Sequence, residues 1–227
     1  MAVELGKAAR EILERLPESH SDRRFIEGVL GVVQGYNARA RLVGKEAPAE
    51  VKRFSPEARQ ALENQGYFVY ELTGQSIRSL REAGGRFWSD WHKDNPEFEA
   101  LTSRVSEVAF NPSELFLPDS NRKPLSQQEE MVAGYSKELA RKISGVEAVI
   151  GEAPEYAELY FTHFRATGEH LFGEKYGYNY ARTKTSTVGS SVAFVGDVRP
   201  VYGLSVYDLH RDYPDDGVFA APLVVPA

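Results

Sequence analysis

The stretch STVGSSVAFVGDVRPVYGLSVYDLHRDYPDDGVFAAPLVVPA, residues 186–227, differs in composition from the rest of the chain. It contains no Lys, Glu, Gln, Met or Trp. Residues 1–185 contain 43 of these amino acids (9 Lys, 24 Glu, 6 Gln, 2 Met and 2 Trp), a rate that would place about ten in the stretch. Charge does not explain the gap, because Arg199 and Arg211 are present and five of the nine Asp of the chain lie here. The composition is therefore filtered by residue identity.

Two filters, one physical and one genetic, account for this composition. Strands and tight turns disfavour Glu and Lys and favour Val, Tyr, Phe, Gly, Asp and Pro. The genetic filter rests on the code, since the five missing amino acids are those that no codon ending in a pyrimidine encodes. A segment whose Asn codons are randomised at their adenines therefore never acquires them. Composition alone leaves both interpretations open.

The pattern within the stretch predicts strands separated by turns. Strands are expected over residues 191–195, 201–209 and 218–225. Turns are expected at Gly196-Asp197 and near Gly203, and residues 210–216 should form a solvent-facing loop. The last strand is the most apolar, which predicts a central position in the core.

Upstream of residue 186 the pattern alternates between helices and short strands. Helices are expected over residues 2–16, 22–41, 56–64, 74–83, 96–105, 125–144 and 154–167. Strands are expected over residues 67–72, 107–110, 114–117, 146–150 and 176–187. Thr73 is expected to cap the fourth helix, and a capping-box pattern opens at Ser126. The sequence thus predicts an α+β protein, with a helical hairpin over residues 1–45 and a domain over residues 46–227.

The overall composition is that of an ordinary globular protein. The 227 residues are 42% hydrophobic, 26% charged and 11% aromatic, enough for one large domain or two small ones. With 27 basic and 33 acidic side chains the net charge is −6, so no nucleic-acid partner is expected. The absence of Cys excludes disulfides, thiolate nucleophiles and Cys-ligated metal sites.

Several classes of protein lack their sequence signals here. No apolar run approaches the roughly 18 residues of a membrane helix, so we expect no membrane span. Residues 1–16 are amphipathic rather than a signal core, so we expect no secretory signal and, by default, a cytoplasmic location. Neither the Gly-x-Ser-x-Gly elbow nor a glycine-rich phosphate loop occurs in the sequence. We therefore expect no enzyme, no catalytic residues and no cofactor.

An aromatic cluster stands at Phe87, Trp88 and Trp91, and His92 follows it. Clusters of this kind more often plug a core than form a platform on which a ligand stacks, so burial is expected here. His92 is expected at the surface or as a helix cap.

Two groups of residues could supply metal ligands. One is His163, Glu169 and His170, and the other is the oxygen-rich set Asp208, His210, Asp212, Asp215 and Asp216. The second group supports an alternative function, a metal-dependent enzyme or a Ca²⁺-binding lectin that uses the acidic loop at residues 208–216. This loop lacks the regular spacing of an EF-hand, and our first expectation is a protein without a metal site.

The stretch also has the composition of a binding surface, because Tyr, Ser, Gly and Asp supply contact area at low entropic cost in paratopes. The residues expected to face a ligand are Ser190, Phe194, Asp197, Arg199, Tyr202, Ser205, Tyr207, His210, Arg211, Tyr213, Asp215 and Asp216. Alternation along the strand places Ser205 and Tyr207 on one face and Val206 toward the core. The frame beneath is expected to consist of Val192, Leu204, Val206, Phe219, Leu223 and Val225. Strand edges and turns also favour these residue types, so a purely structural role stays open.

Four segments carry a resemblance to a known family: NYARTKT (residues 179–185), VAFVG (192–196), GLSV (203–206) and FAAPLVV (219–225). Their order resembles the C-terminal part of the variable proteins of diversity-generating retroelements, which end in a C-type lectin fold. The preceding helix and Leu171-Phe172-Gly173 resemble the frame that such domains place ahead of their variable strands. The resemblance covers mainly residues 145–227.

The resemblance implies both a fold and a function. It implies a C-type lectin-like domain with a small antiparallel sheet, and a reverse transcriptase that rewrites adenines in residues 186–227. Exposed positions would then vary while frame residues stay. The implied function is recognition of an unknown protein or cell-surface ligand, in an oligomeric state that the sequence does not give. A structural or virion-type component organised by the N-terminal helices is a further alternative.

Overall fold

A computed structural model describes residues 52–172, 179–199 and 202–227. The chain divides into two units, Met1–Glu50 and Val51–Ala227, and the described residues belong to the second. The helical hairpin expected over residues 1–45 lies outside the described residues, as does the beginning of the strand expected from Tyr176.

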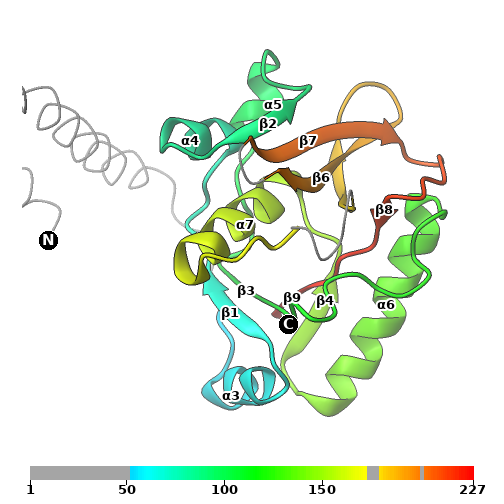
Figure 1. Cartoon of the computed structure of the whole chain (residues 1–227). Coiled ribbons are helices and arrows are strands. Elements are labelled where there is room, and N and C mark those ends of the chain that lie inside the picture. The colour runs from blue at the N-terminus through cyan, green and yellow to red at the C-terminus, as the bar shows by residue number, and fades with distance from the viewer. Residues whose placement is uncertain (1–51, 173–178, 200–201) are drawn as a thin grey trace, which may run out of the picture. The chain divides into compact units, whose positions relative to one another are not determined.

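The described residues form an α+β fold, as predicted (Figure 1). The helices are α3 (Pro56–Asn64), α4 (Ile77–Glu82), α5 (Pro96–Ala100), α6 (Leu125–Lys142) and α7 (Ala153–Thr167). The strands are β1 (Phe68–Glu71), β2 (Phe87–Asp90), β3 (Glu107–Phe110), β4 (Val146–Val149), β5 (Tyr180–Ser186), β6 (Ser191–Arg199), β7 (Gly203–His210), β8 (Val218–Phe219) and β9 (Leu223–Pro226). None of the described helices combines the length and apolarity that a bilayer crossing needs.

Helix ends follow some of the sequence signals and depart from others. Ser55 caps α3 by accepting a hydrogen bond from the backbone, and Gly168 ends α7 in the left-handed conformation at φ 77°, both as predicted. The cap of α4 is Ser76 rather than Thr73. Thr73 instead donates from its backbone N–H and its hydroxyl to the buried carboxylate of Glu158, at 2.6 and 2.7 Å. The expected capping box of α6 is also wrong, because that helix starts after Pro124 without a side-chain cap.

A four-stranded antiparallel sheet has the order β1-β3-β9-β4. The last strand, β9, lies between β3 and β4, where Val224 pairs with Ala109 on one side and Ala148 on the other. All four residues of β9 are buried, which confirms its predicted central position. The strand expected over residues 114–117 is wrong. That segment forms a loop, and its buried Leu115 packs in the core.

A five-stranded mixed sheet has the order β2-β7-β6-β5-β8, with β2 parallel to β7 and β5 parallel to β8. The turn expected at Gly196-Asp197 is wrong, because β6 runs through both residues to Arg199. A register shift lies in this part of the strand, and Asp197 has φ 40°. The strand expected over residues 218–225 is interrupted at residues 220–222, so its two halves join different sheets.

Helix α7 lies between the two sheets, and α6 runs along the outer side of β4 (Figure 1). The core around α7 includes Tyr156, Leu159 and Phe172 together with Leu204 and Val206 of β7. A second cluster packs beneath α6. The expected frame residues are buried at Val192, Leu204, Val206, Leu223 and Val225, and Phe219 is half-buried. Val192, Leu204 and Val206 lie in the five-stranded sheet and Leu223 and Val225 in the four-stranded one, and part of one face of the five-stranded sheet remains open.

Candidate functional site

The open face of the five-stranded sheet carries a group of packed aromatic rings. Phe194 of β6 and Tyr207 of β7 are cross-strand partners whose ring centroids lie 5.7 Å apart. Tyr180 of β5 packs against both rings, at 4.9 and 5.8 Å. Trp91 follows β2 and meets Tyr207 edge-on, at 4.8 Å. The rings thus join three strands of the sheet and the segment after β2 into one surface.

The surface continues past the end of β6. Trp88 of β2 packs against Tyr202, with centroids 4.2 Å apart, and the guanidinium of Arg199 lies 5.8 Å from the Trp88 ring. Trp88 is 43% exposed, Tyr202 52% and Trp91 65%, which is unusual for side chains of this size. We define the aromatic face as Trp88, Trp91, Tyr180, Phe194, Tyr202 and Tyr207.

The expectation of a buried aromatic plug at residues 87–91 is therefore wrong for both tryptophans. Strand alternation accounts for Trp88, because half-buried Phe87 faces Phe161 in the interior and its neighbour then points outward, whereas Trp91 lies in the turn after β2. His92, expected at the surface, is buried and packs on Phe98 at 4.3 Å. Burial lowers the pKa of His92. The tryptophans, predicted to be buried, are exposed, and His92, predicted to be at the surface, is buried.

The loop that follows β7 is attached to residues 122–125 and to β5 through its backbone. The carbonyl oxygen of Arg211 accepts from the N–H of Leu125 at 2.8 Å, and that of Asp215 accepts from the N–H of Arg122 at 2.9 Å. The carbonyl oxygen of Tyr213 accepts from Nη2 of the buried Arg182 at 3.0 Å. None of these bonds depends on which side chains the loop itself carries.

Arg182 is fully buried in β5, beneath this loop. Its Nη2 also donates to the carbonyl oxygen of Lys123 at 3.4 Å. Burial lowers the pKa of Arg182, while the charge of Asp215 raises it. One long side chain thus ties the loop to residue 123 from below.

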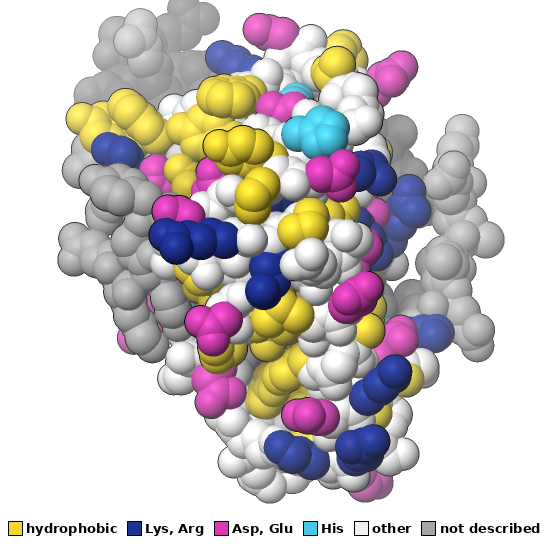
Figure 2. Space-filling view, turned by 90° about the vertical axis from the view of Figure 1, so that its right-hand side faces the viewer, with side chains coloured by type: hydrophobic (Ala, Val, Ile, Leu, Met, Phe, Trp, Pro, Cys, Tyr) yellow, Lys and Arg dark blue, Asp and Glu magenta, His cyan; other side chains and the backbone are white. Residues whose placement is uncertain are grey.

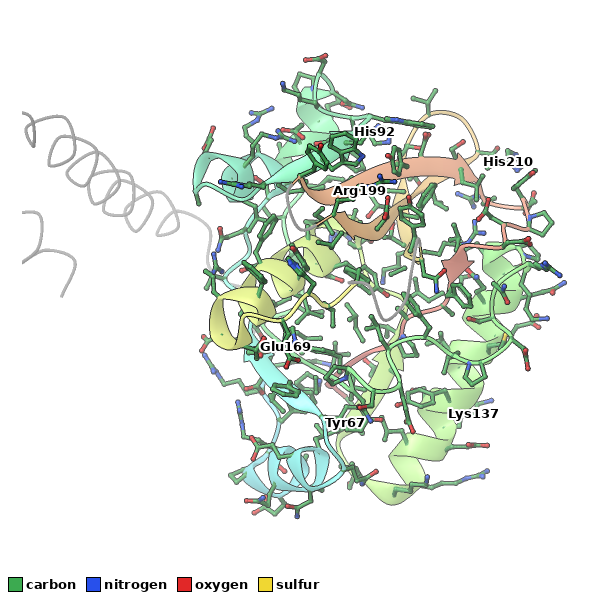
Figure 3. All side chains as sticks on the ribbon, in the orientation of Figure 1. Tyr67, His92, Lys137, Glu169, Arg199 and His210 are labelled. Atoms are coloured by element: carbon green, nitrogen blue, oxygen red, sulfur yellow. The ribbon has the colours of Figure 1, made fainter. Side chains whose placement is uncertain are left out.

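The structure brings most of the residues expected to face a ligand to one end of the described fold. Exposed members are Ser190, Tyr202, His210, Arg211, Tyr213 and Asp216, and half-buried members are Phe194, Arg199, Tyr207 and Asp215. In Figure 3, Arg199 and His210 lie at the same end of the described fold as His92, whereas Tyr67 and Lys137 lie at the opposite end. Figure 2 shows hydrophobic side chains gathered in the upper part of the view, among charged ones.

Two expected ligand-facing residues are buried instead. Ser205 is fully buried, and its hydroxyl donates to the carbonyl oxygen of Asp197 at 3.2 Å. The side chain thus gives this backbone carbonyl a hydrogen-bond partner at the register shift in β6. Asp197 is 5% exposed, and its carboxylate accepts from the hydroxyl of Tyr180 at 3.3 Å. Burial raises the pKa of Tyr180, and the charge of Asp197 raises it further. Both residues therefore support the face from below.

Trp88, Trp91 and Tyr180 belong to this surface although the sequence did not predict them there. The tryptophans stand out as a cluster, but their spacing alone does not reveal which strand face they occupy. Tyr180 lies in the strand expected over residues 176–187, but only the pairing of β5 with β6 brings its ring against Phe194.

The acidic residues of the 208–216 segment do not converge. Asp208 accepts from the hydroxyl of Thr187 at 2.8 Å, Asp215 from the N–H of Gly217 at 2.8 Å, and Asp216 pairs with Arg122 at 2.5 Å. Among the described residues, no three His, Asp or Glu side chains are placed to share a metal ion. The geometry thus gives no support to the alternative with a metal at this loop.

The other group considered for metal binding is separated as well. Nδ1 of His163 hydrogen-bonds the hydroxyl of Tyr70 at 3.1 Å, and Nδ1 of His170 hydrogen-bonds that of Tyr160 at 2.9 Å. Burial lowers the pKa of His163. Both histidines serve as polar partners of aromatic side chains.

Comparison with known proteins returned no match. No protein-family model, no curated protein and no solved structure matches this chain. The aromatic face and the loop beside it are therefore the features from which a function can be inferred.

Proposed function

We propose that this chain is a non-enzymatic recognition protein that binds a protein or cell-surface ligand through the aromatic face and the adjoining loop at residues 210–217. The observation that carries the proposal is the combination of exposed aromatic rings with a loop whose backbone carbonyl oxygens bond it to residues 122–125 and to Arg182. Large aromatic side chains contribute much of the energy at protein interfaces. The neighbouring loop presents the exposed side chains of His210, Arg211 and Tyr213, and its bonds to Leu125, Arg122 and Arg182 use backbone carbonyl oxygens.

We further propose that the scaffold is C-type lectin-like and that the surface is diversified by a retroelement. The order of elements is consistent with the resemblance, since α7 and the buried Leu171 and Phe172 precede β5, β6 and β7. The stretch of unusual composition contains both exposed and buried positions. Within residues 186–219 many side chains are exposed or half-buried, whereas residues 220–226 are all buried.

Diversification requires a surface that tolerates changes of side chain. Positions such as Ser190, Tyr202 and His210 reach solvent, so replacing them costs little packing energy. The buried Val192, Leu204 and Val206 cannot change freely, because core substitutions create cavities or overpacking. Residues 186–219 therefore contain exposed positions that can vary and, between them, buried positions that cannot.

The coding DNA around the gene tests the proposal. We expect a near-repeat of the segment that encodes residues 186–227, close to a reverse transcriptase gene, with differences confined to adenines of the repeat. The changed codons should encode exposed positions such as Tyr202, His210 and Tyr213, and should spare the buried residues 220–226. A locus without such a repeat would contradict diversification and would return the composition to ordinary strand and turn preferences.

A further inference from the structure

A pocket of about 390 Å³ opens beside the aromatic face, at the Trp88–Tyr202 contact. Its described lining is Arg81, Gly85, Arg86, Phe87, Trp88, Asp90, Lys93 and Tyr202. The pocket forms where β2 meets the beginning of β7, at the edge of the five-stranded sheet.

The lining of the pocket is rich in positive charge. Three basic side chains and one acidic side chain line it, although the chain as a whole has a net charge of −6. Arg81 is committed to the buried carboxylates of Asp90 and Glu99. Arg86 and Lys93 are exposed side chains of the same pocket. Their cations remain available to an anion that enters from solvent.

The aromatic members give the pocket an apolar wall. Trp88 and Tyr202 are about half exposed, and the ring of Phe87 lies 5.1 Å from the guanidinium of Arg81. A ligand group that combines a negative charge with neighbouring apolar atoms matches such a lining. A carboxylate carried on a peptide has this character, and Arg recognises carboxylates with two parallel hydrogen bonds.

The pocket is also largely independent of the segment with the unusual composition. Of its described lining residues, Tyr202 alone lies within residues 186–227, and the others come from residues 81–93. The backbones of Gly203 and Arg86 lie in close contact where the segment meets residues 81–93, because a Cβ at Gly203 would clash with the carbonyl oxygen of Arg86. Changes in the segment would therefore alter the aromatic face while leaving most of the pocket unchanged.

We propose that this pocket is a fixed subsite that binds a carboxylate of an acidic peptide segment in the ligand, next to the variable part of the recognition face. The inference rests on the proposed function, since the pocket adjoins the aromatic face. Arg86 and Lys93 contact the carboxylate, and Trp88 and Tyr202 contact the apolar atoms beside it. The subsite orients a ligand in the same way whatever side chains the variable positions carry.

Binding of short peptides tests the subsite directly. Both tryptophans of the chain belong to the aromatic face, so intrinsic fluorescence reports on this region. The full chain is titrated with an acetylated, amidated Asp-Phe-Asp peptide, with the matched Asn-Phe-Asn peptide, and with inorganic phosphate. We expect saturable binding of the acidic peptide that weakens with added salt, and no saturable binding of the amide peptide. Equal binding of phosphate would overturn the assignment to a peptide carboxylate.

Paired variants locate the binding. Arg86→Ala with Lys93→Ala should weaken binding of the acidic peptide about tenfold, because two charge-assisted contacts are lost. Lys137→Ala with Arg141→Ala removes the same charge from exposed positions of α6 and should leave binding unchanged. Equal loss in both variants would overturn the proposal, since it would indicate attraction to net charge alone.

The outcome for the subsite is separable from that of the proposed function. A diversified coding repeat together with an acidic peptide that fails to bind would remove the subsite and leave the recognition function in place. Binding at Arg86 and Lys93 in a chain without a coding repeat would support the subsite and remove diversification.

Discussion

The indole of Trp91 meets the ring of Tyr207 edge-on, with centroids 4.8 Å apart and an interplanar angle of 79°. Trp91 belongs to the segment after β2, outside the stretch of unusual composition, and Tyr207 belongs to β7 within it. This contact joins the two parts of the aromatic face. Edge-to-face geometry is favourable because the positive rim of one ring approaches the negative face of the other.

A double-mutant cycle measures that contact. Trp91→Ala and Tyr207→Ala should each lower the free energy of unfolding modestly, because Trp91 is mostly exposed and Tyr207 half-buried. The coupling energy should fall within about 0.5–1.5 kcal/mol, measured by urea denaturation. Tyr213→Ala, an exposed tyrosine on the loop, is the control and should show no coupling to Trp91. A coupling of zero between Trp91 and Tyr207 would mean that the rings do not stabilise one another.

The loop at residues 210–217 provides a second test, because its carbonyl oxygens bond it to residues 122–125 and to Arg182, and its ion pair to Arg122 comes from Asp216. A triple variant with Ala at His210, Arg211 and Tyr213 should keep the melting temperature of the wild type within a few degrees. Arg182→Ala should cost about 2–5 kcal/mol, because it removes a large buried side chain and leaves the Tyr213 carbonyl without its donor. Comparable losses in both variants would show that the loop side chains belong to the frame.

Sequence patterns predicted the elements whose signals are local. Ser55 and Gly168 mark helix ends through hydrogen bonding and backbone conformation, which depend on immediate neighbours. The apolar run that ends the chain predicted the central position of β9, because an unbroken run of buried residues has no solvent-facing side. These signals need no knowledge of the partner strand.

The errors arose where a partner decides the outcome. The exposure of Trp88 depends on which side of β2 faces α7, and the sequence does not contain that information. Ser76 rather than Thr73 caps α4, because Thr73 donates its hydrogen bonds to the carboxylate of Glu158, which is far away in sequence. Ser205 is buried because the bulge in β6 places the carbonyl of Asp197 within its reach. Candidate site residues were therefore predicted by region more reliably than by individual side chain.

Two glycine substitutions test the close backbone contact between Gly203 and Arg86 beside the pocket. Gly203 has φ +112° and lies against the backbone of Arg86, so Gly203→Ala combines a forbidden conformation with a clash against a carbonyl. We expect a loss above about 3 kcal/mol. Gly189 also has positive φ, at +63°, but no atom lies within 4 Å of the position that a Cβ would occupy there, so Gly189→Ala should cost only about 1 kcal/mol. Similar melting temperatures for the two variants would contradict the close approach at Gly203.

Chelation tests the remaining metal interpretation. The carboxylates of Asp208, Asp215 and Asp216 each have a separate protein partner. We therefore expect the melting temperature to be the same in EDTA as in calcium-containing buffer, because no ligand is lost from the folded state. A fall in the melting temperature on chelation would restore the alternative of a metal-dependent protein.

The ion cluster beside the pocket predicts a dependence of stability on pH. Arg81 lies between the carboxylates of Asp90 and Glu99, which are both almost fully buried. Burial, followed by the hydrogen bond with Glu99, raises the pKa of Asp90 to about 6. The unfolded chain has an Asp pKa near 3.9, so the folded state binds the proton more tightly. Asp90 therefore lowers the free energy of unfolding progressively as pH rises from about 4 to 6.

Asp90→Asn isolates this contribution, since it keeps the side-chain shape and leaves Arg81 paired with Glu99. The melting temperature of Asp90→Asn, measured relative to that of the wild type, should rise from pH 4 to pH 7. The variant is compared with the wild type at each pH because buried His92 has the opposite effect. Its pKa is lowered, so it decreases the free energy of unfolding as pH falls below about 6.5 in both proteins. Asp94→Asn, at an exposed carboxylate nearby, is the control. A difference that is the same at every pH would contradict a raised pKa at Asp90.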